Sequence, residues 1–113
     1  MAGLSCVAVI AFLWISLVPF TPEDVKQAFK SHRFIIYQPD IKSAQITGSF
    51  TDWQPQEMNS IGTSGYWEIE IELFSGEHRF AYILNRRKRI PDPTVPIREK
   101  DDFGGENSIL MIR

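Results

Sequence analysis

Three glutamates within residues 66–73 form the densest group of residues in this sequence that could perform chemistry. Glu68, Glu70 and Glu72 alternate with apolar residues, which predicts a strand with one face on a core and the other in water. A row of carboxylates could hold a metal ion or transfer protons, but same-face neighbours in a strand lie about 6.6 Å apart. That spacing is too wide for tight chelation of one ion, so we expect a solvated strand face.

The other candidates for catalysis lack partners in the sequence. His32 and His78 each stand at the start of an expected strand, and nucleophilic catalysis needs a nucleophile, a base and an orienting group. The acids lie on one strand face or in loops, and no phosphate loop, zinc spacing or dinucleotide fingerprint is present. The single cysteine, Cys6, excludes an internal disulfide and a cysteine-based metal cluster. We therefore expect no catalytic residue, metal site or cofactor, and predict that the chain is not an enzyme.

Trp53 is the side chain best suited to binding a ligand. Residues 44–50 alternate as a strand, and the turn-forming residues Thr51 and Asp52 break this strand just before the tryptophan. Gly48 removes a side chain from the middle of the strand, which indicates that another group packs closely there. The corner would display Trp53 to a ligand; the alternative is that the ring packs under the loop at the end of the sheet.

Residues 86–89 are four consecutive basic residues, Arg-Arg-Lys-Arg. Such a run could dock on phosphate groups or on anionic lipid. The alternative is an exposed hairpin tip, whose charge Glu99, Asp101 and Asp102 balance. The formal net charge of the chain is -2, which gives no reason to expect a nucleic-acid partner.

Beyond Ser31 the sequence shows five or six short strand patterns, with turn signals about every eight to fifteen residues and no convincing helix. This arrangement predicts an all-β fold, either an antiparallel sandwich or a small barrel. Residues 34–37 are apolar on both faces, which predicts a strand covered on both sides. Ser75 and Gly76 predict a hairpin turn that joins residues 66–73 to a return strand at 78–84.

Residues 2–20 contain no charged side chain. As a helix at about 1.5 Å per residue they would span roughly 28 Å, close to the ~30 Å hydrocarbon core of a bilayer. We therefore predict a transmembrane helix or signal anchor at residues 1–20. A cleaved signal peptide is the second interpretation, but it lacks a basic n-region and a small-residue cleavage site. A helix buried in the domain is the third, and so small a domain could hardly cover it.

A capping threonine, a proline and two acids follow the apolar segment and predict a short helix at residues 23–30. The predicted organisation is therefore the apolar helix, a helical linker at 21–31 and a β-sandwich domain at 32–113. We predict a single-pass membrane location. The few lysines and arginines near the span leave the side of the C-terminal domain undetermined.

Four stretches, in this order, resemble one family. Residues 48–53 look like its Gly-x-Phe-Asn-x-Trp corner, residues 67–80 resemble its strand, Pro-Gly-Glu turn and return strand, and residues 91–93 and 104–110 resemble its closing segment. Over about residues 33–113 the sequence is similar to carbohydrate-binding module family 48. That family includes the glycogen-binding domain of the AMP-activated protein kinase beta subunit and the early-set domains of isoamylase and branching enzymes. The resemblance implies an immunoglobulin-like antiparallel β-sandwich that binds α-1,4-glucans or packs against a catalytic domain.

The resemblance also implies binding residues, which transfer to this sequence one at a time. The family's first sugar-stacking tryptophan matches Trp53, its second falls near Arg89, and its binding lysine falls at Ala81. The leucine, threonine and asparagine of its closing loop fall at Phe103, Gly105 and Asn107. The first tryptophan and the asparagine are thus kept, the leucine has an apolar replacement, and the other three positions depart from the family.

These departures weaken the expected sugar site. One aromatic face of roughly 100 Å² contributes about 2.5 kcal/mol, whereas millimolar binding needs about 4.1 kcal/mol. Phe103, Asn107 and the donors of Arg89 would have to supply the difference. We predict a non-catalytic, membrane-tethered module that binds glycogen-type or starch-type α-glucan weakly and gains avidity on a branched polymer. The alternative is a protein-interaction or sensor domain that keeps the sandwich and has lost the sugar site.

Overall fold

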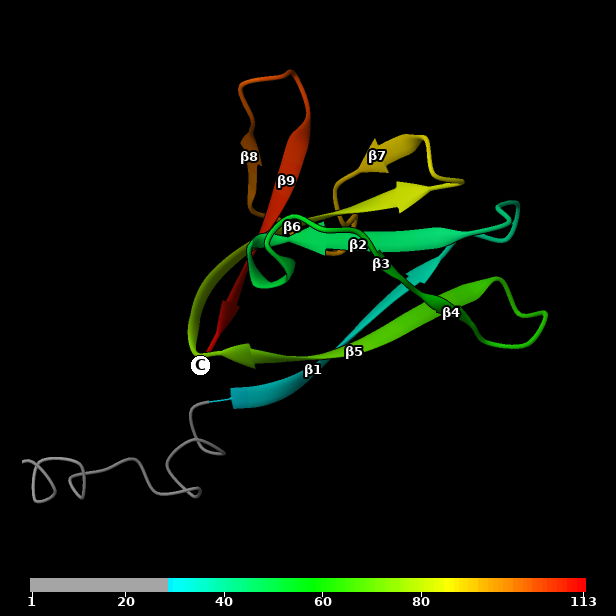
Figure 1. Ribbon diagram of the computed structural model, residues 1–113, viewed down its shortest axis with the longest axis horizontal. Helices are drawn as coiled ribbons and strands as arrows, with labels where there is room; N and C mark the ends of the chain where they lie inside the picture. The colour runs from blue at the N-terminus through cyan, green and yellow to red at the C-terminus, as the bar shows by residue number, and fades with distance from the viewer. Residues whose placement is uncertain (1–28) are drawn as a thin grey trace, which may run out of the picture.

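The computed structural model describes residues 29–113, which form two antiparallel sheets packed face to face (Figure 1). The smaller sheet has the strand order β1-β5-β4. The larger sheet has the order β3-β2-β6-β9-β8, and its short strand β7 pairs with β6. The all-β sandwich predicted from the sequence is confirmed for this part of the chain.

Most strands are short, and a single 3-10 turn interrupts them within the described part of the chain. The smaller sheet contains β1 (Phe29–Tyr37), β4 (Asn59–Ser60) and β5 (Tyr66–Phe74). The larger sheet contains β2 (Ala44–Gly48), β3 (Gln56–Glu57), β6 (Gly76–Leu84), β7 (Lys88–Ile90), β8 (Arg98–Lys100) and β9 (Glu106–Ile112). The 3-10 helix η1 (Ser49–Thr51) follows β2.

The core lies between the two sheets and follows the alternation of each strand. Phe34 of β1, Phe80 of β6 and Tyr82 of β6 form an edge-to-face aromatic row, with ring centroids 5.0 and 5.6 Å apart. The other buried apolar side chains of this core are Ile36, Ala44, Ile46, Met58, Leu73, Leu84 and Ile112. In β5, Glu70 and Glu72 are exposed while Leu73 is buried, so the expected solvated face is confirmed.

A buried polar group ties the loop after β7 to the core. The Oδ2 atom of Asp92 accepts a hydrogen bond of 2.8 Å from the Tyr82 hydroxyl, and its backbone N–H donates to Ser108 Oγ at 2.7 Å. Its Oδ1 atom accepts from the N–H and hydroxyl of Thr94, at 2.8 and 2.7 Å. Burial, together with the adjacent carboxylate, raises the pKa of Tyr82, so its hydroxyl remains a donor.

We predict that Tyr82→Phe lowers the free energy of unfolding by about 1.5 kcal/mol, because a buried carboxylate oxygen of Asp92 loses its donor. Urea denaturation followed by circular dichroism measures the change. Tyr66→Phe is the matched control, since the Tyr66 side chain is 45% exposed on the outer face of the smaller sheet. A loss in Tyr82→Phe no larger than in this control would contradict the prediction.

Three local predictions from the sequence are wrong, the first of them only at its last residues. The strand β1 begins at Phe29, so the last residues of the predicted helix and linker belong to a strand; they pair with β5, from Phe29 opposite Phe74 onward. Ile35 and Tyr37 are 41% and 56% exposed rather than covered, because no third layer lies over the outer face of β1 in the described residues.

The third error concerns Ser75 and Gly76, which form no hairpin. The strand β5 pairs with β1 and β4, whereas β6 pairs with β2, β7 and β9, so the chain crosses between the sheets at this point. Gly76 has a φ of 124°, a conformation that L side chains rarely adopt and that glycine tolerates. A dipeptide that is typical of hairpin turns therefore lies here at the crossover between the two sheets.

The predicted apolar helix at residues 1–20 and most of the predicted linker lie outside the described residues. Among residues 29–113, no helix has the length and apolar character needed to cross a bilayer.

Candidate functional site

The corner after β2 holds Trp53 in an uncommon backbone conformation. Gly48 O accepts a hydrogen bond of 2.9 Å from Trp53 N, and the Thr51 hydroxyl lies 3.1 Å from both the N and the O of Gly48. Asp52 and Trp53 have φ values of 54° and 61°, in the left-handed region. For a tryptophan this conformation costs on the order of 1–2 kcal/mol, and such strain is concentrated at functional sites.

Trp53 is 41% exposed at this corner, and its ring contacts Arg89. The guanidinium carbon of Arg89 lies 5.5 Å from the centroid of the ring, a cation–π arrangement. Arg89 Nη2 also donates a hydrogen bond to Asn107 Oδ1. The structure therefore brings three of the predicted site residues, from the β2 corner, β7 and β9, into one connected group.

The sheet face beside this group is largely buried. In the ladder, Thr47 pairs with Ala81 and Gln45 with Ile83, and Arg89 pairs with Ile83 from the other side. Thr47, Gln45 and Asn107 are buried, and Ala81 is fully buried. Ala81 occupies the position where the resemblance places a binding lysine, so this position offers no donor here.

The other two predicted site residues belong to the turn between β8 and β9. Phe103 is 96% exposed at the tip of the turn, so its ring packs against no other part of the described chain. Gly105 donates its N–H to Asp101 Oδ1 at 2.8 Å, and Phe103 N donates to the same oxygen at 2.8 Å. A Cβ atom on Gly105 would lie 2.8 Å from Asp101 Oδ2, so a larger residue here would displace this carboxylate. Phe103 thus stands apart from the connected group.

Asp101 is a site residue that sequence reasoning missed. The N–H groups of Gly105 and Phe103 hold the pKa of Asp101 below its usual value, and the charge of Arg89 lowers it further. The carboxylate thus organises the turn and lies near enough to Arg89 to be stabilised by it. The spacing of an aspartate two and four residues before its amide donors is an Asx-turn signal, which could have identified it.

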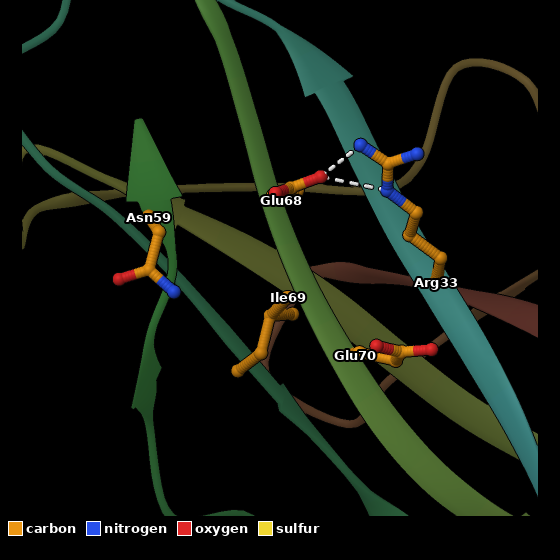
Figure 2. A pocket seen from close by; sticks show the side chains of 5 residues that line it. All are labelled: Arg33, Asn59, Glu68, Ile69 and Glu70. Atoms are coloured by element: carbon orange, nitrogen blue, oxygen red, sulfur yellow. Dashed lines mark hydrogen bonds and ion pairs between the residues drawn. The ribbon is translucent and has the colours of Figure 1, made fainter. Parts of the chain in front are cut away.

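Two of the three glutamates of β5 bind neighbouring polar side chains. Figure 2 shows Arg33 of β1 forming an ion pair with Glu68 of β5, and its Nε lies 2.6 Å from the carboxylate. Ser31 donates a hydrogen bond of 2.8 Å to Glu70. A hollow of about 450 Å³ lies beside these side chains and Asn59. Within residues 29–113, no three histidine, cysteine or acidic side chains are grouped so that they could hold a metal ion.

The two histidines have separate, local environments. His78 Nε2 lies 2.7 Å from the backbone oxygen of Phe74. His32 lines a cavity of about 200 Å³ between the sheets; burial lowers its pKa, and the charge of Asp92 opposes that shift. Neither is hydrogen-bonded to a hydroxyl or thiol nucleophile among the described residues. The prediction that the chain is not an enzyme stays a prediction.

A comparison with protein-family models finds no match. Among curated proteins, the chain is similar to a 1,4-alpha-glucan branching enzyme from Jannaschia sp. (strain CCS1), with 27% identity over 77 residues. The match covers 66% of this chain and 10% of the branching enzyme. The chain is therefore distantly related to a small part of a glucan-active enzyme.

Solved structures share the sandwich at low sequence identity. Ferric enterobactin esterase from Salmonella typhimurium is 15% identical, with a TM-score of 0.65, over 77% of this chain and 32% of the esterase. A putative alpha amylase from the same organism is 17% identical, with a TM-score of 0.59, over 72% of this chain and 13% of the amylase. The chain spans a third or less of these proteins, and the likeness establishes the fold.

Proposed function

We propose that this chain is a non-catalytic α-glucan-binding module with an immunoglobulin-like early-set sandwich, tethered to a membrane through residues 2–20. The observation that carries the proposal is Trp53, held at a strained corner and connected through Arg89 to Asn107. An indole ring can stack on a pyranose face, while the arginine and asparagine can hydrogen-bond to sugar hydroxyls. The distant relation to a glucan branching enzyme supports this class of ligand.

The proposed site provides one aromatic platform. Its gross contribution of about 2.5 kcal/mol falls short of the roughly 4.1 kcal/mol that corresponds to millimolar affinity. Hydrogen bonds from Arg89 and Asn107 contribute the remainder. Binding to a single chain of glucose units is therefore weak, and a branched polymer that engages many tethered copies binds through avidity.

We predict that Trp53→Ala lowers affinity for maltoheptaose at least tenfold, because the stacking surface is lost. Titration calorimetry on the full chain, in a detergent without a sugar headgroup, measures the change, and glycogen affinity electrophoresis provides a second readout. Tyr66→Ala is the matched control, since it removes an aromatic ring of similar exposure from the other sheet.

The outcomes separate the parts of the proposal. A parent chain that binds neither maltoheptaose nor glycogen would refute glucan binding, and binding that survives Trp53→Ala would refute this site. The tether is checked separately: after a carbonate wash, the full chain should remain with membranes and a chain lacking residues 2–20 should not.

The second candidate function is a protein-interaction or sensor domain. The fully buried Ala81, at the position of the expected lysine, and the cation of Arg89 on Trp53 favour it. The exposed pair Tyr37 and Tyr66, whose ring centroids are 4.8 Å apart, gives the outer face of the smaller sheet an apolar area for a partner. This function predicts that capture of a protein partner is lost on Tyr37→Glu and kept on Trp53→Ala.

A further inference from the structure

The basic residues 86–89 span the tip of the hairpin that joins β6 to β7 and the first two residues of β7. Arg86 forms an ion pair of 2.7 Å with Glu57 of β3. Arg87 and Lys88 are exposed, and neither has an acidic partner within 4.0 Å among residues 29–113. The hairpin tip therefore carries two uncompensated cations on a chain whose net charge is -2.

The hairpin tip is fixed to the neighbouring strand region. Asn85 Oδ1 accepts hydrogen bonds from Lys42 N and Ser43 N, at 2.7 and 3.3 Å, and Asn85 N donates to Ser43 O at 2.9 Å. Asn85 and Arg86 have φ values of 52° and 59°. After Asp52 and Trp53, they are a second pair of non-glycine residues in the left-handed conformation. These contacts fix the backbone of the hairpin tip, from which the exposed side chains of Arg87 and Lys88 extend.

The same hairpin supplies Arg89 to the Trp53 site. The guanidinium has five N–H donors, and one nitrogen is engaged by Asn107, so other donors remain for a ligand. A sugar stacked on Trp53 would therefore lie beside Arg89, with Arg87 and Lys88 two residues or fewer away along the chain. Guanidinium and ammonium groups bind phosphate oxygens through charge-assisted hydrogen bonds.

We propose that this site prefers α-glucan chains that carry anionic substituents, phosphate monoesters in particular, with Trp53 stacking on the sugar and residues 87–89 binding the phosphate. This proposal rests on the proposed glucan-binding function and goes further by naming the charge of the ligand. Anionic lipid is the rival partner for the basic hairpin. A carbohydrate is favoured because the guanidinium of Arg89 lies over part of the exposed indole ring, which places the cation next to the indole surface that remains for a sugar.

The test compares maltoheptaose with phosphorylated maltoheptaose, using the full chain in a zwitterionic detergent at 50 mM NaCl. The phosphorylated ligand is expected to bind about tenfold more tightly, and the ratio should approach one at 1 M NaCl, where screening is strong. The double variant Arg87→Ser/Lys88→Ser should reduce the ratio several-fold and leave the affinity for neutral maltoheptaose unchanged. Lys30→Ser/Arg33→Ser, with the same loss of charge on the other sheet, should keep the parental ratio.

Each other outcome overturns a defined part of the proposal. Equal affinity for the two ligands overturns the preference for phosphate and leaves glucan binding intact. If neither ligand binds, the proposed function fails and the preference fails with it. A preference for phosphatidylglycerol over phosphatidylcholine vesicles that is lost in Arg87→Ser/Lys88→Ser, together with equal affinity for the two glucans, assigns the hairpin to lipid. A preference equally strong in Arg87→Ser/Lys88→Ser refutes the assignment of the charge to this hairpin.

Discussion

Gly48→Ala is expected to destabilise the sandwich by about 3 kcal/mol, near the upper end for an overpacking substitution. A Cβ atom at this position would lie 2.6 Å from Arg79 O and 2.9 Å from both Phe80 Cβ and Phe50 Cε1. The first of these is a backbone atom of the adjacent strand β6, so a change of rotamer cannot relieve it. The strands β2 and β6 would have to separate where they pair, opposite Phe80.

The cost at Gly48 is steric rather than conformational, because its φ of -173° is extended backbone that any residue can adopt. Gly62→Ala is the matched control: no atom lies within 4 Å of its Cβ position, but its φ is 55°. We expect the control to lose about 1 kcal/mol from backbone strain. Urea denaturation of the full chain measures both variants, and equal losses would refute the steric explanation.

Gly48 also shows what the sequence could predict. A glycine inside a strand pattern indicates a close approach of another group, and the structure confirms that approach in atomic terms. The alternation of β5 and β6 likewise predicted which side chains face the core, since a strand has only two faces. Local rules sufficed at these positions because the close approach at Gly48 and the alternation of faces both follow from the backbone geometry of a strand.

Pairing between strands was less predictable. The dipeptide Ser75-Gly76 fits a hairpin locally, and only the choice of partner strands shows that the chain changes sheets there. The run at residues 34–37 is apolar on both faces, yet Ile35 and Tyr37 face outward from a strand that belongs to a two-layer fold. The composition of one strand does not determine how many layers of secondary structure will cover its two faces.

The site was predicted in part. Trp53, Arg89 and Asn107 come together although they are separated by up to 54 positions in the sequence. The resemblance supplied these positions, but not the contact of the cation with the ring, which depends on side-chain packing. Phe103 was predicted as a binding residue and stands exposed at the tip of a turn, whose shape depends on Asp101.

Arg89→Trp is the substitution expected to strengthen glucan binding most. In the parent chain, the guanidinium of Arg89 lies over Trp53 and so competes with a sugar for part of the indole surface. A tryptophan at this position would remove the cation and add a second stacking surface. A further ~100 Å² of apolar contact contributes about 2.5 kcal/mol before ordering costs. After those costs we expect affinity for neutral maltoheptaose to rise about tenfold.

Arg89→Ala separates the two effects, because it uncovers Trp53 without adding a ring. We expect this control to change affinity for maltoheptaose less than threefold, since the gain in indole surface is offset by the lost guanidinium donors. Calorimetric titration with maltoheptaose compares the three proteins. An equal gain in Arg89→Ala and Arg89→Trp would mean that Arg89 acts mainly by covering the ring. No gain in either would mean that sugars do not stack at Trp53, and the interaction-domain function would then account better for a tryptophan held at this corner.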